Sequence, residues 1–220
     1  MNVLVIAPHM DDEVLGCGGT IARHVDAGDD VHVSVVCNRA YDHTYDTIAI
    51  DAEKRCADEA RLVLGYQGLR FLDLPDEKLY AHLQEAIMAI EQAVADVQPE
   101  IVYTSFGGDL HQDHRTVAHA VSIVLRASAA PSVRRALAFE VPSGTDQALA
   151  GGGETFAPNV FVDIASQLDR KINAMQAYAR EMRAFPHPRS LEMLTAKARS
   201  RGAQAGLAAA EAFVLLREIV

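Results

Sequence analysis

The chain has 220 residues, of which 50% are hydrophobic and 23% are charged, so it can bury a sizeable core and shows no compositional sign of disorder. Its formal net charge of -10 argues against nucleic acid or an anionic membrane surface as a partner, although local arginines could still bind an anionic small molecule. Three scattered cysteines without a Cys-x-x-Cys pair argue against a disulfide framework and indicate a reducing, cytoplasmic setting. No apolar stretch approaches the ~20 residues of a membrane span, and the N-terminal apolar run lacks the basic flank of a signal peptide.

The first strong signal is the apolar run VLVIA at residues 3–7, which is typical of a buried parallel strand. Directly after it come His9, Asp11, Asp12 and Glu13. In open α/β sheets, ligands bind at the carboxyl ends of the strands. Buried carboxylates repel one another unless a cation joins them, and His and Asp are good zinc ligands. The segment therefore predicts half of a metal site, although an acidic loop of this kind is also common at a helix N-terminus.

Three glycines follow, at positions 16, 18 and 19, and a nucleotide-binding loop is the alternative interpretation of this segment. The dinucleotide fingerprint Gly-x-Gly-x-x-Gly fails at Ile21, and no phosphate loop with Gly-Lys-Ser/Thr is present. The nearby carboxylates would also repel a pyrophosphate. We therefore interpret the glycines as allowing close packing of a helix.

Strand and helix signals alternate along the rest of the chain. Strands are predicted at residues 31–37, 68–72, 101–105, 136–141, 159–164 and 211–216, and helices at residues 50–64, 79–97, 116–130, 167–183 and 190–201. Gly65 is a C-cap for the first of these helices, and Pro99 stops the second. This alternation predicts an α/β fold, with a Rossmann-like, mainly parallel sheet and helices on both faces, in a single domain over residues 1–220. The glycines at 151–153 are expected to form a mobile loop, because they are too few to separate two cores.

The second half of the predicted site follows the strand at 101–105, in the segment DLHQDHR at residues 109–115. His111 and His114 stand three residues apart where a helix begins, so both can face one point. A lone motif of this kind is usually a polar surface turn, and either motif alone is a weak hypothesis. Two strand ends with His/Asp clusters are, however, the pattern that a bipartite metal site in an α/β protein requires.

The two motifs resemble the signatures of the PIG-L/LmbE-type zinc-dependent N-deacetylases. The first signature, Pro/Ala-His-Pro-Asp-Asp-Glu before a Gly-rich helix start, is similar to APHMDDEVLGCGGT at residues 7–20. The second, His-x-Asp-His, matches residues 111–114, and the resemblance covers nearly the whole chain. Met10 replaces the usual proline, which ligates nothing, so this departure concerns the rigidity of the loop rather than the metal.

The resemblance implies three metal ligands, an arrangement typical of catalytic rather than structural zinc. They are His9, Asp12 and His114. It further implies Asp11 as the general base that takes a proton from the attacking water, and His111 as the residue that stabilises the oxyanion or protonates the leaving amine. Asp113 is expected to hydrogen-bond a histidine ring and hold its orientation. Zinc is the expected metal, and Fe2+ or Co2+ fits the same ligands.

Four more residues are predicted to contact the substrate, namely Arg55, Asp76, His187 and Arg189. Arg55 matches an Arg-x-x-x-Glu pattern that the resemblance places near a sugar site, and its alternative is a surface ion pair with Glu59. Asp76 falls where the resemblance implies a sugar-binding aspartate. His187 and Arg189 belong to the turn Phe-Pro-His-Pro-Arg and could bind a phosphate or carboxylate, or simply connect two helices.

The predicted function is that of a metal-dependent hydrolase that removes an N-acetyl or other N-acyl group from an amino sugar or its conjugate, a small-molecule substrate. The alternatives are hydrolysis of another amide or ester in natural-product or cofactor biosynthesis, and a non-catalytic metal- or sugar-binding protein. Asp11 distinguishes an enzyme from a non-catalytic binding protein, because a binding protein could carry Asn at this position whereas a general base must be able to take a proton. The apolar, Ala-rich segment at 203–216 is expected to support a homo-oligomer.

Overall fold

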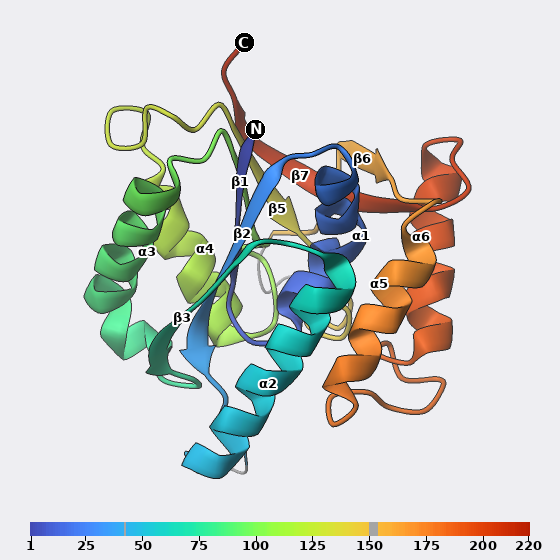
Figure 1. The fold of residues 1–220 in the computed structure, drawn as a ribbon, viewed down its shortest axis with the longest axis horizontal. Coiled ribbons are helices and arrows are strands. Elements are labelled where there is room, and N and C mark those ends of the chain that lie inside the picture. The colour runs from blue at the N-terminus through green and yellow to red at the C-terminus, as the bar shows by residue number, and fades with distance from the viewer. Residues whose placement is uncertain (42, 150–153) are drawn as a thin grey trace.

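The computed structural model describes residues 1–41, 43–149 and 154–220, so the loop predicted at 151–153 lies outside the described residues. The strands of this part of the chain are β1 (Asn2–Ala7), β2 (Asp30–Asn38), β3 (Gly68–Pro75), β4 (Ile101–Ser105), β5 (Arg135–Phe139), β6 (Val160–Asp163) and β7 (Ala210–Glu218). These strands form one seven-stranded sheet of the described residues, in the order β3-β2-β1-β4-β5-β7-β6 (Figure 1). β1 to β5 are parallel, whereas β7 runs antiparallel to both β5 and β6. The predicted mainly parallel sheet is confirmed.

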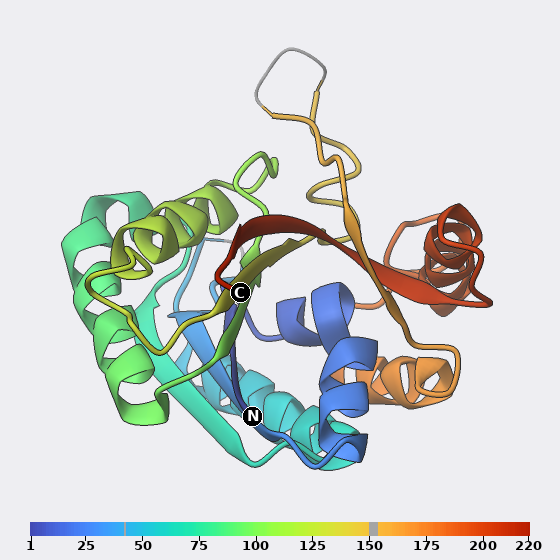
Figure 2. The same ribbon diagram turned by 90° about the horizontal axis from the view of Figure 1, so that it is seen from above.

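Helices cover both faces of this sheet. They are α1 (Asp12–Asp26), α2 (Thr47–Leu64), α3 (Leu83–Val97), α4 (Gln112–Val124), α5 (Leu168–Met175) and α6 (Leu191–Gln204), with the short 3-10 helices η1 (Leu79–His82) and η2 (Gln176–Tyr178). Seen from above, α3 and α4 lie on one side, and α1, α2 and α5 lie on the other (Figure 2). Alternate residues of β1 serve the two cores, with Val3 and Val5 in one apolar cluster and Leu4 and Ile6 in the other. This two-sided burial explains why the strand is apolar at every position.

The strand order reverses at β1. The chain passes from β1 to β2 and β3 on one side, then returns to β4 and β5 on the other. The loops after β1 and β4 therefore flank one crevice at the carboxyl edge of the sheet, which is the position where open α/β sheets bind ligands. Residues 8–11 and 106–111, which begin the two sequence motifs, form these loops.

The Gly-rich helix α1 is kinked, and the glycines allow it to pack closely. Its backbone leaves helical geometry at Cys17, with φ -144° and ψ 23°. A Cβ atom at Gly16 would lie 2.1 Å from the Phe139 ring, and one at Gly19 would lie 2.7 Å from Ile164. The interpretation of these glycines as packing residues is confirmed.

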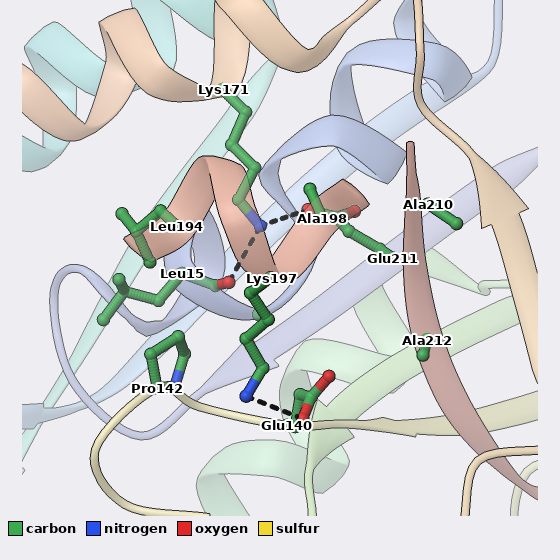
Figure 3. Close-up of a pocket in the computed structure, with 11 residues that line it drawn as sticks. Leu15, Glu140, Pro142, Lys171, Leu194, Lys197, Ala198, Ala210, Glu211 and Ala212 are labelled. Atoms are coloured by element: carbon green, nitrogen blue, oxygen red, sulfur yellow. Dashed lines mark hydrogen bonds and ion pairs between the residues drawn. The ribbon is translucent and has the colours of Figure 1, made fainter. Parts of the chain in front are cut away.

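A buried ion pair joins the kinked helix to the far end of the chain. The backbone N–H groups of Gly19 and Thr20 donate to the Glu211 carboxylate, at 3.0 and 2.7 Å. Lys171 Nζ pairs with the same carboxylate at 2.5 Å and donates to the Leu15 carbonyl at 2.9 Å, beside a cavity of about 20 Å³ (Figure 3). Since both charged side chains are buried, this pair fixes the helix that begins with the first motif.

Several predicted boundaries shift. The helix predicted at 116–130 begins earlier, at Gln112, because His111 is its N-cap and accepts a hydrogen bond from the Asp113 N–H. The helix predicted at 167–183 ends at Met175 and continues only as η2, so the following residues form a loop. The helix at 79–97 begins with the 3-10 turn η1. Gly65 ends α2 in the left-handed conformation, as predicted.

The apolar segment at 203–216 stays a predicted site of self-association, and part of it also packs within the chain. Its second half enters β7, which pairs with β5 and β6, and buries Ala210, Ala212 and Phe213 inside the chain. Packing within the chain therefore accounts for these three buried residues, whereas Ala203, Ala205 and Leu216 are exposed. Among the described residues, no helix is both long enough and apolar enough to cross a membrane.

Candidate metal centre

Three donor atoms from the two motifs converge at the carboxyl edge of the sheet. His9 Nδ1 lies 3.1 Å from Asp12 Oδ2, Asp12 Oδ2 lies 3.2 Å from His114 Nε2, and His114 Nε2 lies 3.3 Å from His9 Nδ1. Two atoms that bind zinc tetrahedrally at about 2.0–2.1 Å are roughly 3.3–3.4 Å apart. The other oxygen of Asp12 is buried and has no hydrogen-bond partner in the described part of the chain. The three side chains therefore fit a divalent metal.

Buried carboxylates contact the second ring nitrogen of each of the two histidines, the nitrogen that does not face the other donor atoms. Nε2 of His9 lies 3.0 Å from Asp76 and 3.4 Å from Asp113, and Nδ1 of His114 lies 3.2 Å from Asp109. A metal-binding histidine almost always places its second ring nitrogen against a carboxylate, carbonyl or water in this way. Each imidazole thus turns one nitrogen toward the shared point and the other toward an anion.

The cluster carries excess negative charge, which raises the pKa values of the His9 and His114 imidazoles. Burial lowers the pKa of His9, but hydrogen bonds to Asp113, Asp12 and Asp76 outweigh it and raise that pKa well above its usual range. The pKa of His114 is raised to about 9, because Asp12 and Asp109 outweigh its burial. The site therefore favours a cation between its side chains, and a metal ion meets that requirement.

Asp11 lies beside the donor atoms in a conformation that is rare for a residue with a side chain, with φ 108°. Its side chain is fully buried, and its Oδ2 accepts a hydrogen bond from Arg189 Nη1 at 2.9 Å. Burial raises the pKa of Asp11 to about 7, an effect that the Arg189 charge opposes. Its Oδ1 has no hydrogen-bond partner among the described residues. One carboxylate oxygen therefore remains available to accept a proton.

His111 packs against both predicted histidine ligands, with ring centroids 4.7 Å from His9 and 4.8 Å from His114. Its Nδ1 accepts a hydrogen bond from the Asp113 N–H at 3.2 Å, so a neutral ring carries its proton on Nε2. The pKa of His111 is lowered to about 4, by burial first and then by the charges of His9 and His114. With 38% of its side chain exposed, the ring is a neutral hydrogen-bond donor at the edge of the cluster.

Of the four predicted substrate contacts, the structure places some at the donor cluster and others away from it. Asp76 reaches the cluster, but both its oxygens are occupied within the chain, since Oδ1 contacts His9 and Oδ2 accepts from the Ala40 N–H at 3.0 Å. This buried carboxylate therefore holds a histidine, and its predicted contact with a sugar stays a prediction. Arg189 also reaches the cluster, through Asp11. His187 stays within its turn, where its Nδ1 accepts from the Arg189 N–H at 3.1 Å.

Arg55 is not brought to the cluster. It lies on the exposed face of α2, and neither its alternative ion pair with Glu59 nor a contact with the donor residues forms in the described part of the chain. Glu53, on the buried face of the same helix, lies 2.6 Å from the Tyr41 hydroxyl and so faces the loop after β2. The i, i+4 spacing in the sequence does not distinguish these two faces.

Two residues that support the site were not predicted from the sequence. Asp109, which orients His114, stands in the second motif, so its place two residues before His111 was a usable signal. Glu181 lies in the loop that was predicted as helix, and it pairs with Arg39 at 2.7 Å and with Arg189 at 3.1 Å. Nothing near residue 181 in the sequence indicates that it reaches the loop after β2.

Comparisons with known proteins agree with this geometry. Residues 4–125, which include both motifs, match the PIG-L family, described as GlcNAc-PI de-N-acetylase. Diacetylchitobiose deacetylase of Thermococcus kodakarensis is 28% identical over 194 residues, covering 80% of this chain and 68% of that protein. Probable N-acetyl-alpha-D-glucosaminyl L-malate deacetylase 2 of Bacillus subtilis is 26% identical over 189 residues, covering 80% and 81%. The crystal structure of a conserved protein from Thermus thermophilus superimposes with a TM-score of 0.79 at 27% identity, covering 100% and 96%.

Proposed function

The chain belongs to the PIG-L family, and on that premise we propose that it is a zinc-dependent deacetylase that hydrolyses the N-acetyl group of an amino sugar or an amino-sugar conjugate. The observation that carries the proposal is the triangle of donor atoms beside Asp11, whose free oxygen can accept a proton. The deacetylases of Thermococcus kodakarensis and Bacillus subtilis support the substrate class, since their names describe acetylated glucosamine derivatives.

His9, Asp12 and His114 would hold the metal. When bound, the ion supplies Lewis acidity that polarises the acetamide carbonyl and lowers the pKa of a water. Asp76 and Asp113 hold the His9 ring, and Asp109 holds the His114 ring, so that each donor nitrogen keeps its direction.

Asp11 acts as the general base. Its Oδ1 takes a proton from the attacking water while the water oxygen forms a bond to the acetyl carbon. Collapse of the tetrahedral intermediate breaks the carbon–nitrogen bond and releases acetate and a free amine, to which the proton passes. The absence of a partner for Oδ1 among the described residues, and the place of Asp11 directly before the donor residue Asp12, support this role.

His111 stabilises the oxyanion that forms during the attack. Its Nδ1 already accepts a backbone hydrogen bond, so the Nε2–H is the group that can donate. The lowered pKa keeps the ring neutral near pH 7, which favours donation of a hydrogen bond over transfer of a proton.

The whole chain acts as one catalytic domain in a reducing, cytoplasmic setting. The single sheet that joins the described strands supports the first statement, and the three free cysteines support the second. The partner is a small N-acetylated substrate. Zinc is the metal we propose, because two histidines and one carboxylate with an open position form a known catalytic zinc arrangement; Fe2+ and Co2+ fit the same donors.

The test is release of amine and acetate from a panel of N-acetylglucosamine, diacetylchitobiose and glucosaminyl conjugates by the zinc-loaded protein. An O-acetylated sugar is the control for an esterase. Equal amounts of amine and acetate from at least one N-acetyl substrate are expected. Release from the O-acetyl sugar alone, or no release from any substrate by a protein that holds its metal, would overturn the proposal.

Asp11→Asn gives the matched variant. It keeps the size and shape of the side chain and removes its ability to take a proton, so turnover should fall by about two to four orders of magnitude. The variant should bind as much metal per chain as the wild type does. Unchanged turnover would remove Asp11 from the mechanism.

A further inference from the structure

The proposed general base is held by residues from the C-terminal part of the chain, which lies beyond the matched family segment of residues 4–125. Arg189 Nη1 donates to Asp11 Oδ2 at 2.9 Å. A guanidinium–carboxylate hydrogen bond of this length is among the strong ones in proteins. A carboxylate can rotate and exchange its two oxygens, so a strong bond to one of them fixes which oxygen stays free.

Arg189 is itself fixed from two further directions. Its Nη1 also donates to Glu181 Oε2 at 3.1 Å, and its Nε donates to Ser143 Oγ at 3.1 Å. Glu181 is in turn held by Arg39, whose Nη2 donates to Oε2 at 2.7 Å, and by the Tyr41 hydroxyl at 3.0 Å from Oε1. Only 16% of the Arg189 side chain is exposed. The guanidinium is therefore anchored before any substrate arrives.

A second connection holds the backbone of Asp11. Its N–H donates to Glu13 Oε2 at 3.1 Å, and the Tyr178 hydroxyl donates to Glu13 Oε1 at 2.6 Å. Backbone conformations with positive φ persist only where surrounding contacts enforce them. η2 and the loop after it thus hold Asp11 at two points, the peptide nitrogen and Oδ2.

We propose that Arg189 is a positioning residue for Asp11, which holds Oδ2 so that Oδ1 faces the water that Asp11 deprotonates, with Glu181 as its anchor. This inference rests on the proposed function. It differs from the sequence-based prediction that Arg189 binds an anionic group of the substrate, and it accounts for the engagement of Nη1 and Nε with Asp11, Glu181 and Ser143.

The two roles predict different kinetics. Loss of a substrate anchor raises KM and leaves kcat nearly unchanged, whereas loss of a positioning contact lowers kcat and leaves KM nearly unchanged. In Arg189→Ala, kcat should fall by about 10- to 100-fold, since misplacement of a general base forfeits part of its catalytic contribution. Arg189→Lys should recover part of this loss, and guanidinium ion added to Arg189→Ala should restore turnover in a saturable manner.

Arg183→Ala is the matched control, because Arg183 lies in the same loop, is exposed and donates only to the carbonyls of Arg180 and Met182 among the described contacts. It should keep wild-type kcat and KM. Glu181→Gln is a second variant for the case that Arg189→Ala does not fold, because glutamine keeps the shape of the anchor. Its kcat should also be lower than that of the wild type, and its circular dichroism spectrum should be unchanged.

Crystal structures of the wild type and Arg189→Ala, with metal content measured on the same preparations, give a readout independent of activity. The wild type should show one Asp11 carboxylate orientation and the variant a rotated or divided one, with metal content equal in both. The same Asp11 orientation in both structures, or a KM rise at constant kcat, would overturn the inference. An inactive wild type with the expected change at Asp11 would count against the proposed function and leave the positioning contact standing.

Discussion

Replacing Lys171 with Met tests whether the buried ion pair with Glu211 holds α1, and with it the first metal motif. The variant keeps most of the side-chain volume but removes the cation that faces the Glu211 carboxylate. Side-chain exposure is only 6% for Lys171 and 4% for Glu211, so solvent cannot take over that role. The N–H groups of Gly19 and Thr20 remain, but they do not carry a full positive charge.

The expected loss follows from this burial. Removing one partner of a buried ion pair costs about 3–5 kcal/mol of the free energy of unfolding, because the other charge is left uncompensated. For a chain of this size, each kcal/mol lowers the melting temperature by about 2–4 °C, so Lys171→Met should melt roughly 6–20 °C below the wild type. Urea denaturation and thermal melting, both followed by circular dichroism, measure the two quantities.

Two further variants complete the test. In Lys171→Met/Glu211→Gln the uncompensated charge is gone, so most of the lost stability should return. Lys197→Met is the matched control, since Lys197 lies beside the same cavity (Figure 3) but is 22% exposed. Its partner Glu140 would still pair with Arg201. This control should lose about 1 kcal/mol or less. A loss below 1 kcal/mol in Lys171→Met, or no recovery in the double variant, would refute the reasoning.

Two other experiments test the carboxylate that orients His114 and the burial of the cysteines. Asp109→Ala removes the carboxylate behind His114 and should weaken zinc binding by about 10- to 100-fold in a chelator competition; an unchanged affinity would mean that this contact does not orient the ring. At pH 7, a maleimide should label the native chain at the half-buried Cys56 first, because Cys17 and Cys37 are buried and their thiol pKa values are raised, to about 12 for Cys37. Mass mapping that finds native Cys17 labelled as fast as Cys56 would contradict the packing of α1 on the sheet, and equally fast labelling of Cys37 would contradict the burial of β2 in the apolar cluster on the opposite face.

The parts of this protein that could be predicted from its sequence are those encoded by contiguous residues. The apolar run of β1 and the alternation of strands and helices suffice to predict a parallel sheet, since each pattern is local. The two metal motifs follow β1 and β4, whose carboxyl ends meet at the point where strand order reverses. His9, Asp12 and His114 therefore converge for a topological reason that the sequence already contains.

The residues that the sequence could not place act across long separations. Arg189 reaches Asp11, and Glu181 reaches Arg189, only because the chain leaves the helical path after η2, where the apolar pattern continues and predicts helix up to residue 183. Asp76 is predicted as a sugar contact, and its position against His9 and the Ala40 N–H could not be foreseen from the sequence. Such roles depend on tertiary contacts between loops, which leave no periodicity in the sequence.

The most direct test of the account is the metal content of the wild type and His114→Ala, measured by elemental analysis after zinc loading and removal of the excess. His119→Ala is the control, because His119 is an exposed residue of the same helix. About one tightly held ion per chain is expected in the wild type and in the control, and that ion should be lost in His114→Ala, because one of three protein ligands is removed. A wild type without bound zinc, or a His114→Ala variant that retains it, would contradict the single site formed by the two distant motifs.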